Sequence, residues 1–576
     1  MVKGKVVILA ALIGLSMFLM LCSNIEYSAA VLNRFKSYDE LKEFLQKSEI
    51  HHPHLYPYDY TLRILEGAKL TSMEGFGYSK TNIQVEGVDE ADVAKTDGEY
   101  LYIISGQSVV IVKAYPPEDL AVLSRITVNG ILKQLFINNN RLVIFYEVGS
   151  WSDVKTFIQV YDVSSRESPT LKREVIVEGQ YFNSRMIGNY AYVIVMRSAG
   201  MANSDVELPK ICFDGEWREI SATEIYYSNI LDCAYFFTTV VAVNVQDDGQ
   251  EPTYGPILLG ATASMYVSLD NIYLAITAYD KTYLHRIHIQ ESEIVYTADG
   301  QVPGVFLNQF SMDEYNGYFR IATAHVGRNS LYVLNMNLEI VGSLENIAPK
   351  EQIHSARFMG SICYLVTFRK VDPFFVIDLT DPYNPKVLGA LKVSGYSDYL
   401  HSYDENHVIG VGKETIPAEK GDFSWYQGVK ISLFDVSDVC NPKEIAKYVI
   451  GERGTDSPVL RDHKAFLFDR EKNLLVIPVF VADVNESAYL NGVPPYVCGE
   501  PVWQGAYVFT VSLAIEEKIV LRGAITHIED GNVMNSTYHI TRAMYIGNFL
   551  YTISEGKVKI NSLVDLSEIK ELTIKA

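Results

Sequence analysis

The 576-residue sequence has few cysteines and lacks the compact motifs that mark many catalytic sites. None of its six cysteines is spaced as CxxC, so a zinc site or thioredoxin-like chemistry has no support. A P-loop, a GxGxxG turn after a strand, a GxSxG elbow, an HExxH helix and an EF-hand loop are also missing. These absences remove the enzymes that a single motif identifies, but not a site built from single residues of several repeats.

Positive charge is scarce as well. The chain has 49 Lys and Arg against 70 Asp and Glu, a formal net charge of −21. Such a chain repels phosphate backbones, so we expect no nucleic-acid partner. The excess negative charge is typical of a soluble exported protein, and it leaves proteins, glycans and small ions as partner classes.

Five cysteines lie after residue 30, and an odd number cannot all form disulfides with one another. Cys212–Cys233 and Cys440–Cys498 are candidate disulfides, because Cys212 and Cys233 flank one loop-like insertion and Cys498 lies in another. Cys363 stands in the apolar run ICYLVTF and is expected to be a small buried residue.

The amino terminus has the pattern of an export signal. Lys3 and Lys5 precede an apolar run over residues 6–21, and the small residues at 28–30 suit a signal peptidase. The alternative is an uncleaved N-terminal membrane anchor, and Cys22 directly after the run hints at a lipid anchor. Either way, the sequence predicts a protein that is secreted or held on the outer face of the cytoplasmic membrane.

A short helix is predicted over residues 37–47. Ser37 can cap it with Glu40 three residues later, while Leu41, Phe44 and Leu45 form one apolar face. The proline-containing stretch 51–60 that follows predicts an extended linker. Its histidine cluster is read as incidental rather than as a metal site.

From about residue 81 the apolar pattern changes to a period of two and short units repeat. One unit is a strand, an Asp, a polar turn with proline and a second strand, as in FFVIDLTDPYNPKVLGALKV from Phe374. Asp162, Asp378 and Asp435 hold the same place in three copies. Each is predicted to close an Asx-turn by accepting backbone N–H groups.

A second unit precedes each of these and has an Arg, a few apolar residues, a Gly turn and a run rich in Tyr and Val. Its clearest copies begin at Arg185, Arg357 and Arg542. The turn glycines are expected at positive φ, and they are Gly188, Gly360 and Gly547.

Alternating the two units gives four strands per repeat of roughly 45 to 60 residues, the size of a propeller blade. The sequence therefore predicts an all-β fold, a β-propeller with a short N-terminal helix. Nine units can be counted from Asp92; eight blades are preferred, with seven to nine allowed. The expected domains are a signal or anchor at 1–30, a helix and linker at 31–80, and the propeller at 81–576. Ring closure is expected to pair a strand near residues 96–104 with the last blade.

The segment TNIQVEGVDEADVAKTDGEYLYI, residues 81–103, resembles the opening motif of a family of secreted β-propeller proteins of archaea and some bacteria. Residues 357–412 and 462–479 resemble the same family, which is distantly similar to WD40 repeats. The resemblance covers most of residues 81–576 and implies the propeller fold. It implies no activity, because the family as a whole has no established function.

In a propeller the first strand of each blade faces the central channel, and this position defines the candidate ligand-binding residues. They are Arg185, Arg357, His401, His463 and Arg542. If these side chains meet at one mouth of the channel, they favour a carboxylate, phosphate or sulfate, or a soft metal if several His converge. The alternative, which we prefer, is that they tie the blades together through neighbouring carboxylates and carbonyls.

Four carboxylates within seven residues form an acidic segment, and they are Glu86, Asp89, Glu90 and Asp92. Oxygen ligands at this density could hold calcium, the one cofactor that the sequence suggests. The preferred alternative is structural, with Asp89 and Asp92 capping turns and Glu86 and Glu90 in solvent.

Two functions from different classes remain. The favoured one is a binding or scaffold protein displayed at the cell surface, with a protein, a glycan or a small anion on the propeller face. The alternative is an extracytoplasmic hydrolase or metal-dependent oxidoreductase with its site in the central channel, which would need converging groups in an open cavity.

Overall fold

The computed structural model describes residues 33–51, 77–150, 153–202, 205–228, 235–369, 372–421, 423–489 and 493–575. The predicted export signal, Cys22, Cys233 and most of the histidine-containing linker lie outside these residues. Among the helices of the described part, none is long and apolar enough to cross a membrane.

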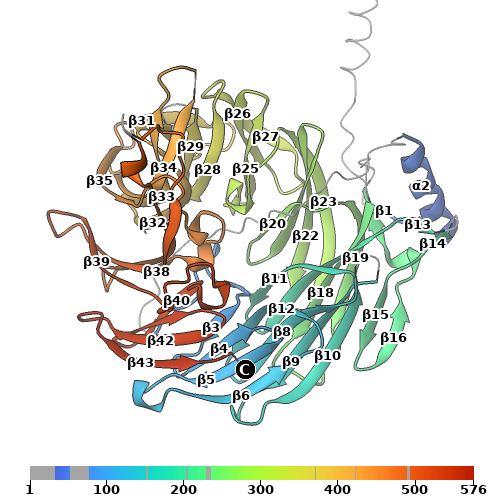
Figure 1. The fold of residues 1–576 in the computed structure, drawn as a ribbon. Coiled ribbons are helices and arrows are strands. Elements are labelled where there is room, and N and C mark those ends of the chain that lie inside the picture. The colour runs from blue at the N-terminus through green and yellow to red at the C-terminus, as the bar shows by residue number, and fades with distance from the viewer. Residues whose placement is uncertain are drawn as a thin grey trace, which may run out of the picture.

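The repeating strands form separate antiparallel sheets that follow one another round a closed ring (Figure 1). In the described residues there are nine sheets of at least four strands, called blades 1 to 9 in chain order. The prediction of an all-β propeller with one short N-terminal helix is confirmed. The nine units counted in the sequence each form one sheet, a number within the predicted range of seven to nine.

Blade 1 has the basic four strands, and blades 2 and 3 carry the additional ones. Blade 1 consists of β3 (Ala94–Thr96), β4 (Tyr100–Ser105), β5 (Ser108–Lys113) and β6 (Ala121–Thr127). Blade 2 consists of β7 (Ile131–Asn138), β8 (Arg141–Val148), β9 (Lys155–Asp162) and β10 (Thr170–Glu178), extended outward by β15 (Lys210–Phe213) and β16 (Glu216–Glu219). Blade 3 consists of β11 (Gln180–Ile187), β12 (Tyr190–Ser198), β18 (Tyr235–Asn244) and β19 (Thr253–Gly260), with β2 (Val88–Glu90) on its inner edge and β17 (Tyr226–Tyr227) and β1 (Asn33–Arg34) on its outer edge.

Blades 4 to 9 have four strands each. Blade 4 is β20 (Ser264–Val267), β21 (Asn271–Ala278), β22 (Lys281–Gln290) and β23 (Glu293–Pro303). Blade 5 is β24 (Met312–Tyr315), β25 (Tyr318–His325), β26 (Arg328–Leu334) and β27 (Ile340–Ile347). Blade 6 is β28 (Gln352–Met359), β29 (Ile362–Phe368), β30 (Asp372–Asp378) and β31 (Lys386–Val393).

The last three blades complete the circle. Blade 7 is β32 (Tyr396–Asp404), β33 (His407–Pro417), β34 (Ser424–Asp435) and β35 (Lys443–Ile450). Blade 8 is β36 (Leu467–Asp469), β37 (Leu474–Asp483), β38 (Glu500–Val511) and β39 (Ile519–Ile525). Blade 9 is β40 (Arg542–Ile546), β41 (Phe549–Ile553), β42 (Lys557–Ser562) and β43 (Glu568–Thr573). Short 3-10 turns lie in the connections, and they are η1 (Pro117–Asp119), η2 (Ala222–Glu224), η3 (Gln309–Ser311), η4 (Pro458–Leu460), η5 (His463–Ala465), η6 (Glu486–Ala488) and η7 (Ser536–Tyr538).

The core is divided into layers between neighbouring blades. Nine apolar clusters can be distinguished in the described residues, each shared by two successive blades. The cluster that contains Leu101, Val110, Met544 and Tyr551 joins blade 9 to blade 1. Side chains alternate between the two faces of a strand, so each blade has two apolar faces and buries one against each neighbour.

The predicted way of closing the ring is wrong. β4 pairs with β3 and β5 inside blade 1, and blade 9 forms its four strands from the end of the chain. Closure uses the apolar cluster and one isolated bridge, Tyr78 to Ile546, with the Ser79 amide donating to the Tyr545 carbonyl at 2.9 Å. Closure by packing suffices because both blades present complete apolar faces.

The predicted turn chemistry is confirmed. The Oδ1 atoms of Asp162, Asp378 and Asp435 accept from the amides two residues on, at 2.8, 2.9 and 2.9 Å. The three turn glycines have φ between 56° and 60°. Both motifs therefore serve geometry, as the sequence analysis preferred.

Outer strands approach the turns of the next blade very closely at a few glycines. A Cβ at Gly389 would lie 2.4 Å from the Val439 carbonyl oxygen, and one at Gly342 would lie 2.1 Å from the Pro382 carbonyl oxygen. Because Val439 and Pro382 belong to the turns of the following blades, these glycines set the spacing of successive blades.

The predicted helix is α2 (Tyr38–His51), which begins where the cap was expected. The Glu40 amide donates to Ser37 Oγ at 3.2 Å, and Leu41 and Leu45 are buried in the cluster between blades 2 and 3. The connection between β12 and β18 forms the small hairpin β13 (Met201–Ala202) and β14 (Asp205–Val206), followed by β15 and β16. Helix α2 and this connection therefore build extra structure on the outer edge of blades 2 and 3 (Figure 1).

The predicted Cys440–Cys498 disulfide does not form, and Cys233, the predicted partner of Cys212, lies outside the described residues. Cys440 and Cys498 are exposed free thiols, and Cys212 is a buried free thiol. Cys363 is buried as expected, and burial raises the pKa of its thiol to about 12.

Candidate functional site

The inside of the ring is crossed by residues 78–93, here called the crossing segment. It starts at β40 of blade 9, where Tyr78 pairs with Ile546. Asn82 Nδ2 then donates to Tyr399 Oη of blade 7 at 3.1 Å. Gln84 Nε2 donates to the Met312 carbonyl of blade 5 at 3.3 Å. β2 finally adds to the inner edge of blade 3, and Asp92 forms a bridge with Leu135 of blade 2.

Glu90 is the buried centre of this segment, with an exposed fraction of 1 %. Its Oε1 accepts from the Gln84 amide at 2.9 Å, and its Oε2 lies 3.4 Å from both Arg185 Nη2 and His463 Nε2. Burial raises the pKa of this carboxyl, but Arg185 and His463 outweigh it and hold the pKa well below its usual range. Glu90 is therefore a buried anion held by two of the five predicted channel residues.

Arg542 is paired with two acidic groups. Its Nε lies 2.9 Å from both Asp92 carboxylate oxygens, and its Nη2 lies 2.5 Å from Asp462 Oδ2. Burial raises the pKa of the Asp462 carboxyl, but the charge of Arg542 outweighs burial and lowers this pKa to about 2. The predicted role of tying blades together through carboxylates is what Arg542 performs.

Arg357 and His401 are differently placed. Arg357 is 2 % exposed and lies over the Phe310 ring with its Cζ 4.9 Å from the centroid. Its Nε and Nη2 have no hydrogen-bond partner among the described residues. His401 is fully buried, and its Nδ1 lies 2.8 Å from Tyr399 Oη. In the part of the chain that the structure describes, His401 Nε2 has no hydrogen-bond partner.

The five predicted channel residues do come together on the inner side of the ring. Arg185 and Arg357 stand at equivalent places, opposite Tyr192 and Tyr364 in their hairpins. Arg542 is five rather than three residues before its turn glycine, so it lies one inward-facing position further from the turn than the repeat predicted. The five are buried behind the crossing segment and do not line an open mouth.

The four residues of the predicted calcium site point to different partners. Asp89 pairs with Lys95 at 2.7 Å, Glu90 with Arg185, and Asp92 with Arg542, while Glu86 is exposed. The described residues contain no group of three or more His, Cys, Asp or Glu side chains that could hold a metal ion. The prediction that Glu90 is solvated is wrong, because the crossing segment brings it between Arg185 and His463.

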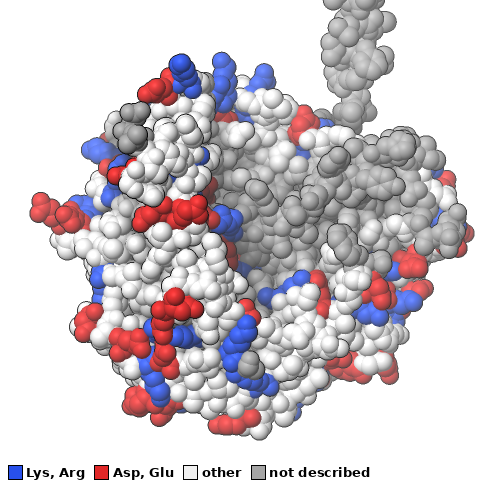
Figure 2. Space-filling view, in the orientation of Figure 1, with Lys and Arg blue, Asp and Glu red and all other residues white. Residues whose placement is uncertain are grey.

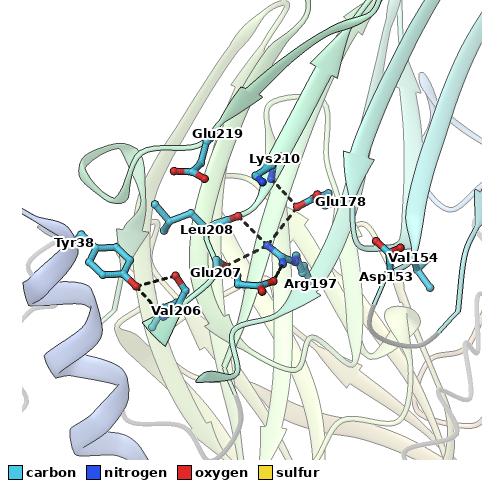
Figure 3. A pocket seen from close by; sticks show the side chains of 10 residues that line it. All are labelled: Tyr38, Asp153, Val154, Glu178, Arg197, Val206, Glu207, Leu208, Lys210 and Glu219. Atoms are coloured by element: carbon cyan, nitrogen blue, oxygen red, sulfur yellow. Dashed lines mark hydrogen bonds and ion pairs between the residues drawn. The ribbon is translucent and has the colours of Figure 1, made fainter. Parts of the chain in front are cut away.

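A pocket lies elsewhere, at the outer edge of blades 2 and 3 (Figure 3). It has a volume of about 670 Å³ and lies between α2, the hairpin β13–β14 and strands β10, β12, β15 and β16. Its lining residues are Tyr38, Asp153, Val154, Glu178, Arg197, Val206, Glu207, Leu208, Lys210 and Glu219.

Arg197 organises one wall of this rim pocket. It donates to the carbonyls of Glu207 and Leu208 at 3.2 and 2.9 Å and pairs with Glu207 Oε2 at 2.8 Å (Figure 3). Tyr38 Oη donates to the Val206 carbonyl at 3.0 Å and accepts from the Val206 amide at 2.8 Å. Helix α2 thereby fixes the hairpin that walls the pocket.

The rim pocket is acidic with an apolar part. Its lining contains four carboxylates and two basic residues. One of these, Arg197, is already paired with Glu207 and Glu178. Asp153 and Glu219 are exposed and have no described partner. The pocket is therefore suited to a cationic group attached to apolar atoms. Elsewhere on the visible face, acidic and basic side chains are interspersed around the ring (Figure 2).

Comparison with known proteins agrees with the ring of blades. The family model described as "Beta propeller domain" matches residues 78–566. The chain belongs to this β-propeller domain family. The match begins at the first residue of the crossing segment, so the segment is part of what this family model covers.

Two relatives found by sequence comparison are archaeal proteins. An uncharacterised protein of Archaeoglobus fulgidus is 27 % identical, over 94 % of this chain and 95 % of that one. An uncharacterised protein of Methanocaldococcus jannaschii is 28 % identical, over 85 % of this chain and 82 % of that one. A solved structure, a putative 6-phosphogluconolactonase from Bacteroides uniformis, overlaps with 12 % identity and a TM-score of 0.33, over 59 % of this chain and 92 % of that one. Overlap at this level carries no information on function.

Sequence reasoning missed most partners of the channel residues in this β-propeller domain. Asn82, Gln309, Phe310 and Tyr399 contact the predicted residues, but they come from loops and strands without a shared pattern. The sequence contained one signal of these contacts. The four carboxylates of residues 86–92, taken together with the Arg that recurs in the repeat, could have indicated ion pairs inside the ring. The rim pocket was missed because it lies in an insertion outside the repeat.

Proposed function

We propose that this protein is an extracytoplasmic binding or scaffold protein, displayed at the cell surface, that binds its partner at the outer rim of the propeller. The observation that carries the proposal is the position of the crossing segment. It buries Glu90, Arg185 and Arg542 in pairs inside the ring, and a pocket of about 670 Å³ lies instead at the rim. A partner therefore has access to the side chains of the rim pocket, whereas the charged side chains inside the ring are already paired with one another.

The chemistry of the rim pocket favours a protein partner with a basic segment. Asp153 and Glu219 offer negative charge without a described partner, while Tyr38, Val206 and Leu208 offer apolar surface. Lysine and arginine combine a cationic head with an apolar stem and fit such a mixed lining. The negative charge repels a small anion there, and it gives a neutral glycan no Coulombic attraction.

Surface display is supported by the amino-terminal pattern of positive residues, apolar run and small residues. The test is protease treatment of intact cells that produce the full chain, with a cytoplasmic protein as control. Digestion of the propeller while the control stays intact supports display. Protection of both proteins until the cells are lysed contradicts it.

Binding is tested with immobilised full-length protein and three probes: decapeptides of lysine and leucine, matched decapeptides of glutamate and leucine, and neutral oligosaccharides. We expect the lysine peptides to bind and the Asp153→Asn/Glu219→Gln variant to lose ~2- to 5-fold in affinity per carboxylate, as for exposed charge pairs. Glu516→Gln/Glu517→Gln, which neutralises two exposed carboxylates of blade 8, is the matched control.

The result has three informative outcomes. Loss of lysine-peptide binding in the rim variant but not in the control supports the rim pocket. Equal loss in both variants shows general attraction to an acidic protein and contradicts a specific site. Preference for the glutamate peptides or the oligosaccharides contradicts the proposed partner class.

A further inference from the structure

The connection between β37 and β38 of blade 8 contains an acceptor pattern for a sugar. Asn485, Glu486 and Ser487 form an Asn-Xaa-Ser sequence, the pattern that carries N-linked glycans in exported proteins. A second such sequence begins at Asn535, in the connection between blades 8 and 9. Because a pattern of three residues also arises by chance, the surroundings of the two asparagines decide which of them is suited to carry a glycan.

The first acceptor sequence stands in the exposed part of a loop whose two ends are fixed. At the start of the loop, the Val484 amide donates to Glu452 Oε2 at 2.6 Å. At its end, the Gly499 amide donates to the Arg453 carbonyl at 2.7 Å. Both anchors belong to the connection between blades 7 and 8. Residues 485–488 are all exposed, so the loop presents the acceptor sequence to solvent from a firm base.

The side-chain amide of Asn485 is available for reaction. Its Oδ1 accepts a hydrogen bond from Ser487 Oγ at 2.5 Å, so the hydroxyl that the pattern requires already contacts the amide. Asn485 precedes the 3-10 turn η6 but does not cap it with its side chain. Within the described residues, Asn485 Nδ2 donates to no acceptor. The nitrogen that would bond to a sugar therefore has no competing partner in the described chain.

The second acceptor sequence is more enclosed. Asn535 and Thr537, its first and third residues, are both half-buried. Thr537 Oγ1 accepts from Lys575 Nζ at 3.0 Å, and the Thr537 carbonyl accepts from the Gly556 amide at 2.9 Å. The hydroxyl that the pattern requires is thus held by the end of the chain. In the folded protein, Asn485 is therefore the better acceptor of the two.

We propose that Asn485 is a site of N-glycosylation, and that its sugar donor is an oligosaccharide activated as a lipid phosphate ester. The step forms a bond between Asn485 Nδ2 and the anomeric carbon of the first sugar, and it breaks the bond between that carbon and the phosphate oxygen. Nδ2 loses one proton, and the lipid phosphate leaves with the bonding electron pair. Because the pattern is used in exported proteins, this inference rests on the extracytoplasmic location proposed above.

The glycan and the rim pocket lie on one face of the ring. Residues 484–499 connect the second and third strands of blade 8, and the connection that contains β13 and β14 joins the second and third strands of blade 3. Successive strands of a blade are antiparallel, so these two connections leave the ring on the same face. Blades 3 and 8 lie on different sides of the ring (Figure 1). A bulky, hydrophilic glycan on blade 8 therefore keeps this face in water and stands away from the rim pocket.

The first test is peptide mass spectrometry of the full-length protein from its native cells, together with the protease treatment that tests display. Trypsin releases Asn485 and Asn535 in separate peptides, 473–518 and 523–542. We expect peptide 473–518 to carry the added mass of a sugar chain. A protein that protease reaches on intact cells but that bears no sugar on this peptide overturns the inference and leaves the proposed display intact. A protein that is protected until lysis and bears no sugar contradicts both.

The second test changes the acceptor sequence at exposed positions. Asn485→Gln keeps an amide but places it one methylene group further out, and Ser487→Ala removes the hydroxyl. We expect both variants to lose the added mass on peptide 473–518. Glu486→Gln, which alters the exposed residue between them and leaves the pattern intact, is the matched control and should keep it. Persistence of the added mass in Asn485→Gln would place the sugar on another residue and overturn the proposal.

Discussion

Arg542 and Asp92 are 450 residues apart in the chain and form a two-pronged ion pair inside the ring. Arg542 Nε lies 2.9 Å from each carboxylate oxygen of Asp92, and Nη2 lies 2.7 Å from Oδ1. Arg542 begins the last blade and Asp92 ends the crossing segment before the first blade. The pair therefore links both ends of the propeller where no strand is shared.

We predict that Asp92→Ala lowers the free energy of unfolding by about 3 to 5 kcal/mol, because it leaves Arg542 buried with Asp462 as its remaining carboxylate. Thermal or urea unfolding measures the change. Asp270→Ala, at an exposed carboxylate with no described partner, should change the stability by less than about 0.5 kcal/mol. The double variant Asp92→Ala/Arg542→Met should be less destabilised than the sum of the single changes. Strict additivity would contradict the pairing.

Close approach of blades at Gly389 leads to a second prediction. Gly389→Ala puts a methyl group 2.4 Å from the Val439 carbonyl oxygen and 2.7 Å from that of Cys440, so blades 6 and 7 must separate. We expect a loss of about 1 to 3 kcal/mol, as for overpacked interiors. Gly200→Ala, whose Cβ would meet nothing closer than Ser198 Oγ at 3.8 Å, is the control. Equal melting temperatures for the two variants would contradict the close contact.

Tyr38 links α2 to the rim pocket, and Tyr38→Phe tests the link. The change removes the acceptor for the Val206 amide and the donor to its carbonyl, with an expected cost of about 1 kcal/mol. Hydrogen exchange followed by mass spectrometry should show faster exchange in peptides that contain Val206. Tyr496→Phe removes a hydroxyl from an exposed tyrosine and should leave this exchange unchanged. Slow exchange at Val206 in the first variant would show that α2 does not hold the hairpin.

Acid sensitivity is predicted for His527 of the connection to blade 9. Burial, followed by the charges of Lys559 and Lys557, lowers the pKa of His527 to about 3 in the folded protein. An unfolded histidine titrates near 6.5, so below that pH the unfolded state takes up the proton first. The stability that this group contributes is complete above pH 6.5 and decreases by up to about 1.4 kcal/mol per pH unit as the pH falls towards 3.

The measurement is the melting temperature between pH 6.5 and 5. We expect a shallower decrease for His527→Gln than for the wild type. Ser554→Ala removes a hydrogen bond to the same ring, 2.9 Å from Nδ1, without removing the titrating group. It should lower the melting temperature at every pH and keep the wild-type slope. Parallel curves for His527→Gln and the wild type would show that this histidine does not set the slope.

Thiol reactivity distinguishes exposed from buried cysteines and tests whether Cys440 and Cys498 are free. Alkylation of the native protein should modify Cys440 and Cys498, which are exposed free thiols. Cys212 and Cys363 are buried and should react only after unfolding. Peptide mass spectrometry before and after denaturation measures both sets. A Cys440–Cys498 crosslink in the native protein would contradict the free thiols.

The repeat itself was readable because it depends on local rules. The turn residues Asp162, Asp378 and Asp435 and the glycines after each inner strand are required by backbone geometry, and they behave as predicted. A period of two and turns at regular spacing were enough to predict blades in a ring. For the acidic segment, residue type and spacing showed where the carboxylates are but not which cations face them. The sequence therefore could not decide between the calcium alternative and the preferred structural one.

What the sequence alone determined is thus the all-β repeat, the propeller class, the N-terminal helix with its cap, and the set of inward-facing Arg and His residues. Only the tertiary structure decided how the ring closes, that Glu90 is buried, that Arg357 lacks the partner that Arg185 has, and that the rim pocket exists. The physical reason is distance along the chain. Local hydrogen bonds and side-chain alternation act over a few residues, whereas the contacts that pair or isolate a charge join segments hundreds of residues apart.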